Sequence, residues 1–252
     1  MTSSLISSPY VCSIDIGKKN FALTVEEIDQ QALSEINDLS ENLKYNSDGT
    51  LTSAFQEIIN KVYQSGKIVY TNNHDLTQNT TSSKYLDREI FYNMNALLES
   101  LSAEYLEKCL FVIVEQQMAF GKMHNTMALK LGQHCQSFFI LKFGRKQTVI
   151  EFPSYHKTQV LGAQKIKTTT KSGLVRYKPI DKPARKKWSV AETRKLLTLR
   201  NDLQTLQLLD GGGVVKDTSD KKKKKTKKVK ADDISDTILQ LQAWKYLTFV
   251  KK

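Results

Sequence analysis

The stretch Tyr10–Asn20, YVCSIDIGKKN, begins with an apolar run that contains one carboxylate, Asp15. A turn is expected at Gly17, directly after this run. Because side chains alternate along a strand, Asp15 shares a face with Val11 and Ser13. A carboxylate within an apolar strand is costly to bury unless it is paired, protonated or bound to a metal ion. Asp15 is therefore either an ordinary acid in a solvated turn or one member of a buried site, and the other acids of the chain decide between the two.

Composition indicates a globular protein with a sizeable core, since 40% of the 252 residues are hydrophobic. We expect a single elaborated α/β domain over residues 1–252, with an insertion at 29–64 and flexible basic segments at 162–187 and 211–230. No apolar run reaches the roughly 20 residues of a membrane span, so we expect no membrane partner. The three cysteines lack CxxC spacing, which favours reduced thiols inside a cell over a zinc site.

The net charge of +12 is unevenly distributed along the chain. Residues 145–230 hold 24 Lys and Arg against 7 Asp and Glu, whereas the rest of the chain is mildly acidic. A strongly basic half indicates a polyanionic partner, with nucleic acid first. The alternative is that the lysines, which are densest at 221–230, form a solvated tail.

Periodicity predicts a mixed α/β sheet, with an antiparallel hairpin at one edge and crossover connections beyond it. Strands are predicted at Tyr10–Ile16, Phe21–Glu27, Lys67–Thr71, Cys109–Glu115 and Gln147–Phe152. Helices are predicted at Thr52–Gln64, Tyr85–Lys108, Met123–Phe143, Pro153–Leu161, Trp188–Leu209 and Ala231–Val250. Continuous apolarity places the fourth strand centrally in the sheet, and a right-handed crossover brings its end beside the first strand.

The helix predicted at Trp188–Leu209 has local signals at both ends. Ser189 and Glu192 have capping-box spacing, and three glycines beginning at Gly211 would stop the helix. Asp210 and the glycines also resemble a phosphate loop superficially.

Two further acidic groups stand where they could meet Asp15. Glu115 closes the central strand, and Asp232, Asp233 and Asp236 open the last helix. Residues three apart on a helix share a face, so Asp233 and Asp236 point the same way. Helix capping and the helix dipole would explain one or two of these aspartates. If the acids converge, their mutual repulsion would raise each pKa unless cations lie between them, and Mg²⁺ or Mn²⁺ are the natural occupants.

These motifs together resemble a known family. SIDIGKKN at Ser13–Asn20, VIVEQQM at Val112–Met118, FPSYHK at Phe152–Lys157 and KADDISDTILQ at Lys230–Gln240 are similar to the four motif regions of RuvC-like four-way (Holliday) junction resolvases. The similarity is greatest to the branch found in poxviruses, other large DNA viruses and fungal mitochondria. It spans residues 10–247, and the first and last motifs together are fairly specific.

The resemblance implies an RNase H-like fold with a five-stranded mixed sheet, a homodimer and two divalent ions, Mg²⁺ or Mn²⁺, per active site. It implies paired nicks across a four-way DNA junction. Carried over by motif, the catalytic carboxylates and metal ligands are Asp15, Glu115, Asp233 and Asp236, with Asp232 a further candidate ligand. Lys157 stands where the family has a lysine that stabilises charge on the scissile phosphate.

Basic residues around these motifs are the candidate DNA contacts, because neutralising phosphates would overcome the repulsion of an acidic site for DNA. They are Lys18, Lys19, Lys165, Lys167, Arg185, Lys186, Lys187, Lys227, Lys228 and Lys230. The branch and the lack of an Arg-rich leader favour an intracellular location, in a cytoplasmic viral factory or a nucleus, over a mitochondrion.

Two other functions stay open from the sequence. One is a DNA-binding protein without catalysis on an RNase H-like scaffold, and the other is an ATPase of the actin or sugar-kinase type, suggested by the turn after Asp15 and by Asp210–Gly213. If the protein is a nuclease, RNA–DNA hybrids or DNA branches simpler than a four-way junction are alternative substrates. Cleavage assays on four-way junction, linear duplex and hybrid separate these functions.

The lysine-rich run gives a first testable prediction. Deleting Lys221–Lys228 should weaken binding to DNA of any sequence and reduce the dependence of log Kd on log salt, because each lysine on a phosphate contributes roughly 0.9 to that slope. Titrations at several salt concentrations measure this effect. An unchanged slope would show that the run is a solvated tail.

Overall fold

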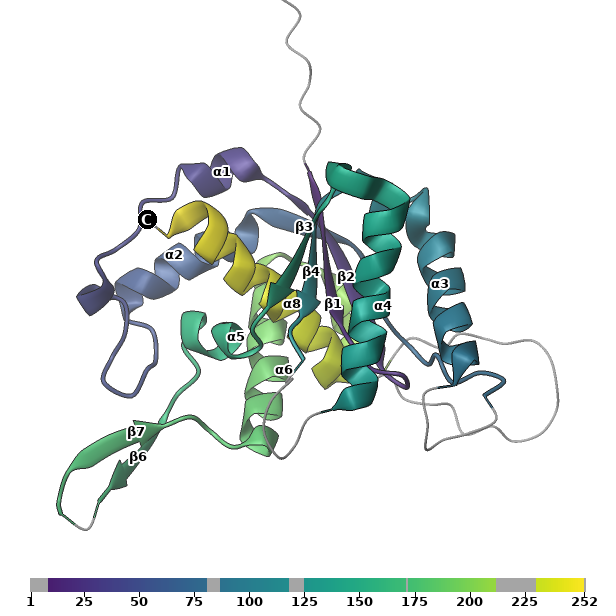
Figure 1. Cartoon of the computed structure of the whole chain (residues 1–252). Helices are drawn as coiled ribbons and strands as arrows, with labels where there is room; N and C mark the ends of the chain where they lie inside the picture. Colours follow the sequence, from purple (N-terminus) through teal and green to yellow (C-terminus); the bar gives the residue numbers. More distant parts are fainter. Residues whose placement is uncertain (1–8, 81–86, 118–124, 171, 212–229, 252) are drawn as a thin grey trace, which may run out of the picture.

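The computed structural model describes residues 9–80, 87–117, 125–170, 172–211 and 230–251. At its centre is a five-stranded sheet in the order β3-β2-β1-β4-β5 (Figure 1). β2 is antiparallel to both of its neighbours, whereas β4 runs parallel to β1 and to β5. The strands are β1 (Tyr10–Asp15), β2 (Phe21–Ile28), β3 (Gly66–His74), β4 (Cys109–Glu115) and β5 (Thr148–Phe152). The predicted five-stranded mixed sheet is confirmed, and its order and directions are those of the RNase H-like fold.

Helices cover both faces of the sheet. α3 and α4 pack on one face, and α2, α5, α6 and α8 lie on the other (Figure 1). The helices are α1 (Gln30–Ser34), α2 (Ser53–Gln64), α3 (Arg88–Ser102), α4 (Thr126–Phe143), α5 (Tyr155–Val160), α6 (Lys182–Leu199), α7 (Leu203–Leu209) and α8 (Ala231–Lys245). A π-helical turn (Tyr246–Val250) extends α8, and short 3₁₀ turns occupy 41–43, 106–108 and 144–146. No helix in the described ranges is both long enough and apolar enough to cross a membrane.

Alternation along β1 divides its side chains between two hydrophobic cores, as predicted. Val11 belongs to the core under α8, while Cys12 and Ile14 belong to the core under α3 and α4. β4 is divided in the same way, with Ile113 on the first side and Val114 on the second. β4 therefore lies in the interior of the sheet, and the three cysteines are buried free thiols.

The prediction for the helix at Trp188–Leu209 was wrong in its start and in its continuity. α6 begins at Lys182, where the Asp181 side chain accepts a hydrogen bond from the backbone N–H of Ala184 and Pro183 lies in the first turn. Asp before Pro in a first turn is itself a strong helix-start signal. α6 ends at Leu199, and α7 is a separate helix that begins after Asn201, whose φ is +56°.

Two other segments are more regular than expected. The region 162–187, expected to be flexible, contains the hairpin β6 (Ile166–Thr169) and β7 (Val175–Lys178) and the start of α6. The region 29–64, expected to be an insertion, contributes buried Phe55, Ile59 and Val62 to the core around α8. Most of the segment expected at 211–230 lies outside the described residues.

α8 is buried from Ile234 to Lys245 except at Asp236, so its polar side chains need partners. The Thr237 hydroxyl is 2.7 Å from that of Thr24 on β2, and Ser13 on β1 donates to the Thr237 carbonyl at 2.9 Å. Gln240 Nε2 donates to the Ser13 hydroxyl at 3.2 Å and to the carbonyl of Ile113 on β4 at 3.3 Å. These bonds, which we call the polar ladder, fix how far α8 lies along the sheet.

A buried ionic cluster fixes the far end of α8. Glu26 on β2 accepts from Lys245 at 2.7 Å, from Arg200 at 2.9 Å and from Gln242 at 2.8 Å. Burial alone would raise the pKa of Glu26, but the two cations outweigh it and lower that pKa to about 2. Lys245 shares its single carboxylate with Arg200, and burial lowers the pKa of Lys245 to about 8.

Glu26→Gln should destabilise the protein by about 3–5 kcal/mol at pH 7, because it leaves two buried cations without their carboxylate. Urea unfolding measures the change. The matched control is Glu27→Gln on the same strand, where Glu27 is only partly buried and should change stability by less than about 0.5 kcal/mol.

The stabilisation that the Glu26 carboxylate provides should depend on pH. A carboxyl whose pKa is lowered by folding stabilises the protein above its unfolded pKa, and that stabilisation is lost as the pH falls through its folded pKa. The difference between wild type and Glu26→Gln should therefore shrink as the pH falls from about 4.5 toward 2. A difference independent of pH would contradict this role.

Candidate active site

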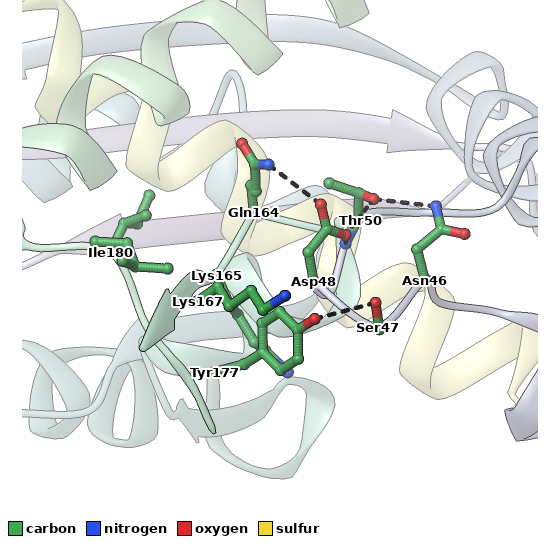
Figure 2. Close-up of a pocket in the computed structure, with 10 residues that line it drawn as sticks. Asn46, Ser47, Asp48, Thr50, Gln164, Lys165, Lys167, Tyr177 and Ile180 are labelled. Carbon is green, nitrogen blue, oxygen red and sulfur yellow. Dashed lines mark hydrogen bonds between the residues drawn. The ribbon is translucent and has the colours of Figure 1, made fainter. Parts of the chain in front are cut away.

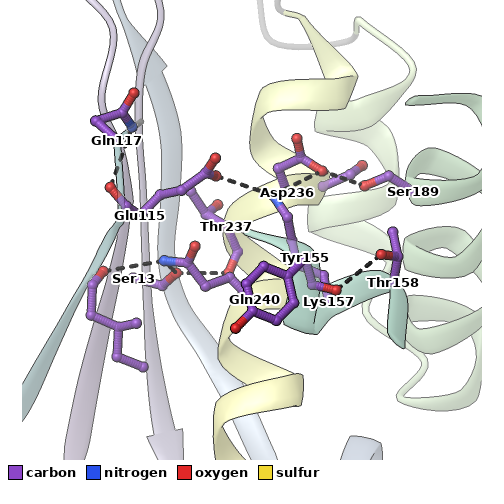
Figure 3. A network of polar contacts seen from close by, with 12 residues as sticks. Ser13, Glu115, Gln117, Tyr155, Lys157, Thr158, Ser189, Asp236, Thr237 and Gln240 are labelled. Carbon is purple, nitrogen blue, oxygen red and sulfur yellow. Dashed lines mark hydrogen bonds and ion pairs between the residues drawn. The ribbon is translucent and has the colours of Figure 1, made fainter. Parts of the chain in front are cut away.

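The predicted carboxylates meet at one edge of the sheet. Asp15 ends β1 and Glu115 ends β4, and because these strands are adjacent and parallel their ends lie together. Asp233 and Asp236 come from the first two turns of α8. All four line a single pocket of about 340 Å³. Figure 3 shows Glu115 and Asp236 facing each other from the strand and the helix.

The fifth predicted residue, Lys157, lies between two of these acids. Its Nζ is 3.1 Å from Glu115 Oε2 and 3.4 Å from Asp236 Oδ1 (Figure 3). Only 5% of Lys157 is exposed, although α5 is a short helix at the surface of the sheet. Burial would lower the pKa of Lys157, but the neighbouring carboxylates outweigh it and raise that pKa above its usual value. The ammonium is therefore held charged.

One ammonium does not neutralise four carboxylates. Burial, followed by the charge of Glu115, raises the pKa of Asp15 well above its usual value, although Lys157 opposes the shift. Burial and the neighbouring Asp232 raise the pKa of Asp233 as well. Raised values of this kind mark a site with an excess of buried negative charge, which a bound cation would relieve.

Other side chains orient the carboxylates. Ser189 on α6 donates to Asp236 Oδ1 at 2.7 Å, and the amide of Asn73 on β3 donates to Asp233 Oδ2 at 3.2 Å. No local sequence signal indicated that Ser189 or Asn73 would contact one of these acids. Ser189 was predicted to cap a helix, and that interpretation was wrong because its hydroxyl faces α8 from the interior of α6.

Asp232, the further candidate ligand, lies differently from the other acids. It forms an ion pair with Lys186 and does not line the pocket. None of the three aspartates is the N-cap of α8, so the interpretation that they cap the helix is wrong. The N-cap is Lys230, whose side chain makes no capping hydrogen bond. The aspartates are inside the first turns, where the helix dipole favours them.

The carboxylate oxygens that line the pocket are the type of ligand that a hard divalent cation prefers. Asn73 Oδ1 has no hydrogen-bond partner in the described part of the chain, but Asn73 does not line the pocket. Among the described residues, no three Asp, Glu, His or Cys side chains are yet arranged to enclose an ion, and the ammonium of Lys157 lies between Glu115 and Asp236. An ion would have to displace that ammonium or bind beside it.

Basic residues surround the acids on one side. Arg185 and Lys186 of the predicted DNA contacts line the pocket, together with Lys182 and Trp188 from the same helix. Lys182 lies in the same basic run but was not among the predicted DNA contacts. Lys187 is exposed on α6, Lys18 and Lys19 lie in the turn after β1, and Lys230 is the N-cap of α8. Lys167 is on β6 and Lys165 directly precedes it, and neither lines the acidic pocket, whereas Lys227 and Lys228 lie outside the described residues.

The alternative assignment of a phosphate loop at Asp210–Gly213 finds no structural support. Asp210 follows helix α7 and not a strand, which is not the setting of a phosphate loop. None of the described histidines lines the acidic pocket. His156, next to Lys157, packs against Phe152 and Tyr155.

Comparisons with known proteins give one similar sequence and several similar solved structures. No protein-family model matches the chain. Uncharacterized protein 170L of Invertebrate iridescent virus 6 is 29% identical over 255 residues, which cover 96% of this chain and 91% of that protein.

Solved structures similar to the chain include two of Thermus thermophilus RuvC, one alone (15% identity, TM-score 0.45) and one with a Holliday junction substrate (12%, 0.41). Another is the yeast mitochondrial Holliday junction resolvase Ydc2 (13%, 0.49). These matches cover 96% of this chain, and 98%, 98% and 80% of the respective solved chains. At TM-scores below 0.5, the function has to be inferred from the residues of the site itself.

Asp15→Asn should stabilise the metal-free protein at pH 7, because it removes a carboxylate whose ionised form is disfavoured by burial and by the charge of Glu115. A carboxyl with a raised pKa stabilises the fold below its unfolded pKa, and that stabilisation is lost as the pH rises through its folded pKa. The gain from Asp15→Asn should therefore disappear below about pH 4. Denaturant unfolding in a chelating buffer at several pH values measures it.

The control for this prediction is Glu57→Gln on α2, which removes an exposed carboxylate and should change stability by less than about 0.5 kcal/mol. If Asp15→Asn instead destabilised the protein, the claim that the pocket holds an excess of buried negative charge would be contradicted.

Proposed function

We propose that this chain is a metal-dependent endonuclease that resolves four-way DNA junctions. The observation that supports it best is the pocket in which Asp15, Glu115, Asp233 and Asp236 meet around Lys157, beside a cationic helix. Carboxylates with raised pKa values suit the binding of divalent ions, and a basic rim suits a polyanionic substrate.

In this proposal the four carboxylates hold two Mg²⁺ or Mn²⁺ ions. Bound there, such ions activate a water molecule and stabilise the leaving oxygen of a phosphodiester. Ser189 and Asn73 hold the carboxylates of Asp236 and Asp233 in fixed orientations. The ammonium of Lys157 turns from the acids toward the scissile phosphate, where it stabilises developing negative charge.

The cationic rim brings DNA to this acidic site. Lys182, Arg185 and Lys186 on α6 would bind phosphates next to the scissile one, which offsets the repulsion between DNA and the carboxylates. The further contacts proposed are the remaining basic residues predicted from the sequence, namely Lys18, Lys19, Lys165, Lys167, Lys187, Lys227, Lys228 and Lys230.

A homodimer follows from the reaction. Each chain has one acidic pocket of this kind within the described residues, whereas resolving a junction requires cuts in two strands. Two copies related by a two-fold axis would supply two equivalent sites. The similarity to a protein of an iridescent virus supports the viral branch of the resolvases and, with it, a cytoplasmic or nuclear site of action.

Asp15→Asn should abolish cleavage of a four-way junction in Mg²⁺ while leaving the affinity for the junction largely intact, because it removes a metal ligand and not a phosphate contact. The measurement combines a gel assay of cleavage with a binding titration in the absence of divalent ions. Glu57→Gln is the matched control and should cut like wild type.

Three outcomes would contradict the proposal. Retained cutting by Asp15→Asn would show that this carboxylate is not a ligand. Equal cutting of linear duplex or RNA–DNA hybrid would assign a different nuclease. Binding without cutting in either Mg²⁺ or Mn²⁺ would favour the non-catalytic DNA-binding protein.

A further inference from the structure

The β6–β7 hairpin projects from the body of the molecule between two elements of the acidic pocket. It follows α5, which carries Lys157, and precedes α6, which forms the cationic rim (Figure 1). Its register pairs Ile166 with Lys178, Lys167 with Tyr177 and Thr168 with Arg176. The hairpin has no role in positioning the carboxylates.

The base of the hairpin is braced by a second loop, residues 45–51, which an isolated bridge between its ends closes. Asp48 accepts from the Gln164 side chain at 3.1 Å and, through its carbonyl, from the Lys165 N–H at 2.7 Å. The Tyr177 hydroxyl donates to Ser47 at 3.3 Å (Figure 2). The hairpin is therefore held in a fixed direction at its base.

The hairpin is uniformly basic. Residues 166–178, which form the hairpin, contain four Lys and Arg and no Asp or Glu. Because side chains alternate along a strand, Lys167 lies on the face of the hairpin that carries Tyr177, whereas Arg176 and Lys178 lie on the opposite face. All three cations are exposed. A structural hairpin at a protein surface would not need the same charge on both faces.

The outer part of the hairpin also exposes apolar side chains. Leu174 is 55% exposed and Val175 is 45% exposed. Neither packs against the hydrophobic cores of the domain. A ribbon with two exposed apolar side chains near its turn and cations on both faces is complementary to a surface with negative charge on two sides and stacked bases between.

We propose that the β6–β7 hairpin inserts into the major groove of one duplex arm of the DNA substrate. This inference rests on the proposed function for the identity of the substrate. A two-stranded β-ribbon fits the major groove, which has phosphates along both walls and base edges at its floor. Lys167 contacts one wall, Arg176 and Lys178 contact the other, and Leu174 and Val175 near the turn face base edges.

The position of the hairpin in the chain supports this partner. The duplex held by the hairpin would be continuous with the DNA held by Lys182, Arg185 and Lys186, since the hairpin leads directly into α6. The hairpin therefore orients a branch of the substrate over the acidic pocket.

The test is the triple variant Lys167→Gln/Arg176→Gln/Lys178→Gln in the full-length chain. Its affinity for a four-way junction, measured without divalent ions, should fall on the order of tenfold to a hundredfold at about 0.15 M salt, and its salt slope should fall by roughly three. Dimethyl sulfate methylates guanine N7, a major-groove atom. Wild type should protect N7 positions in one groove of a duplex arm, and the variant should lose that protection.

The matched control is Lys61→Gln/Lys67→Gln/Lys146→Gln, which removes the same charge from exposed sites on other elements and should keep both affinity and protection. Thermal unfolding of both variants should match wild type, because all six side chains are exposed.

Several results would overturn the inference. They are unchanged protection in the hairpin variant, equal losses in the control, no protection by wild type, and no DNA binding at all. A change in oligomeric state with unchanged protection would instead assign the hairpin to contacts between copies of the chain. None of these readouts requires cutting, so a protein that binds and protects but does not cleave would fail the proposed function and still support the hairpin as a groove contact.

Discussion

Four carboxylates from three separate parts of the chain share one pocket only because the fold holds them there against their mutual repulsion. The parallel pairing of β1 and β4 fixes Asp15 beside Glu115, and the polar ladder fixes α8, with Asp233 and Asp236, against those strands. The ladder uses hydrogen bonds from hydroxyl and amide groups that are buried and would be costly to leave unpaired. The position of the helix, and with it the whole site, depends on that requirement.

The remaining negative charge is the property of the pocket on which the proposed function rests. Lys157 neutralises part of it, and Ser189 and Asn73 orient two of the acids, yet the pKa of Asp15 stays raised. The repulsion within such a cluster lowers the stability of the folded protein, and destabilising arrangements of this kind are common at active sites. The Glu26 cluster at the other end of α8 differs, since its carboxylate is fully surrounded by donors.

The sequence predicted the sheet and its acids because those signals are local. Alternation in β1, continuous apolarity in β4 and the three-residue spacing of Asp233 and Asp236 each follow from the geometry of one element. The roles of Ser189 and Asn73 could not be predicted, because their partners are 47 and 160 positions away in the chain. The start of α6 was missed because the signal at Asp181 lies within a basic stretch, which composition alone assigned to a flexible segment.

The acidic centre, the cationic rim and the braced basic hairpin together support the proposal that the protein binds branched DNA and cuts it. Its central claim is that Asp15, Glu115, Asp233 and Asp236 bind divalent ions together. Anomalous diffraction at the manganese edge, from crystals of the protein with junction DNA and Mn²⁺, tests this claim most directly. We expect two manganese peaks bounded by the four carboxylates, with the ammonium of Lys157 moved from between Glu115 and Asp236. Manganese bound elsewhere, or a pocket with no manganese in the presence of DNA, would contradict it.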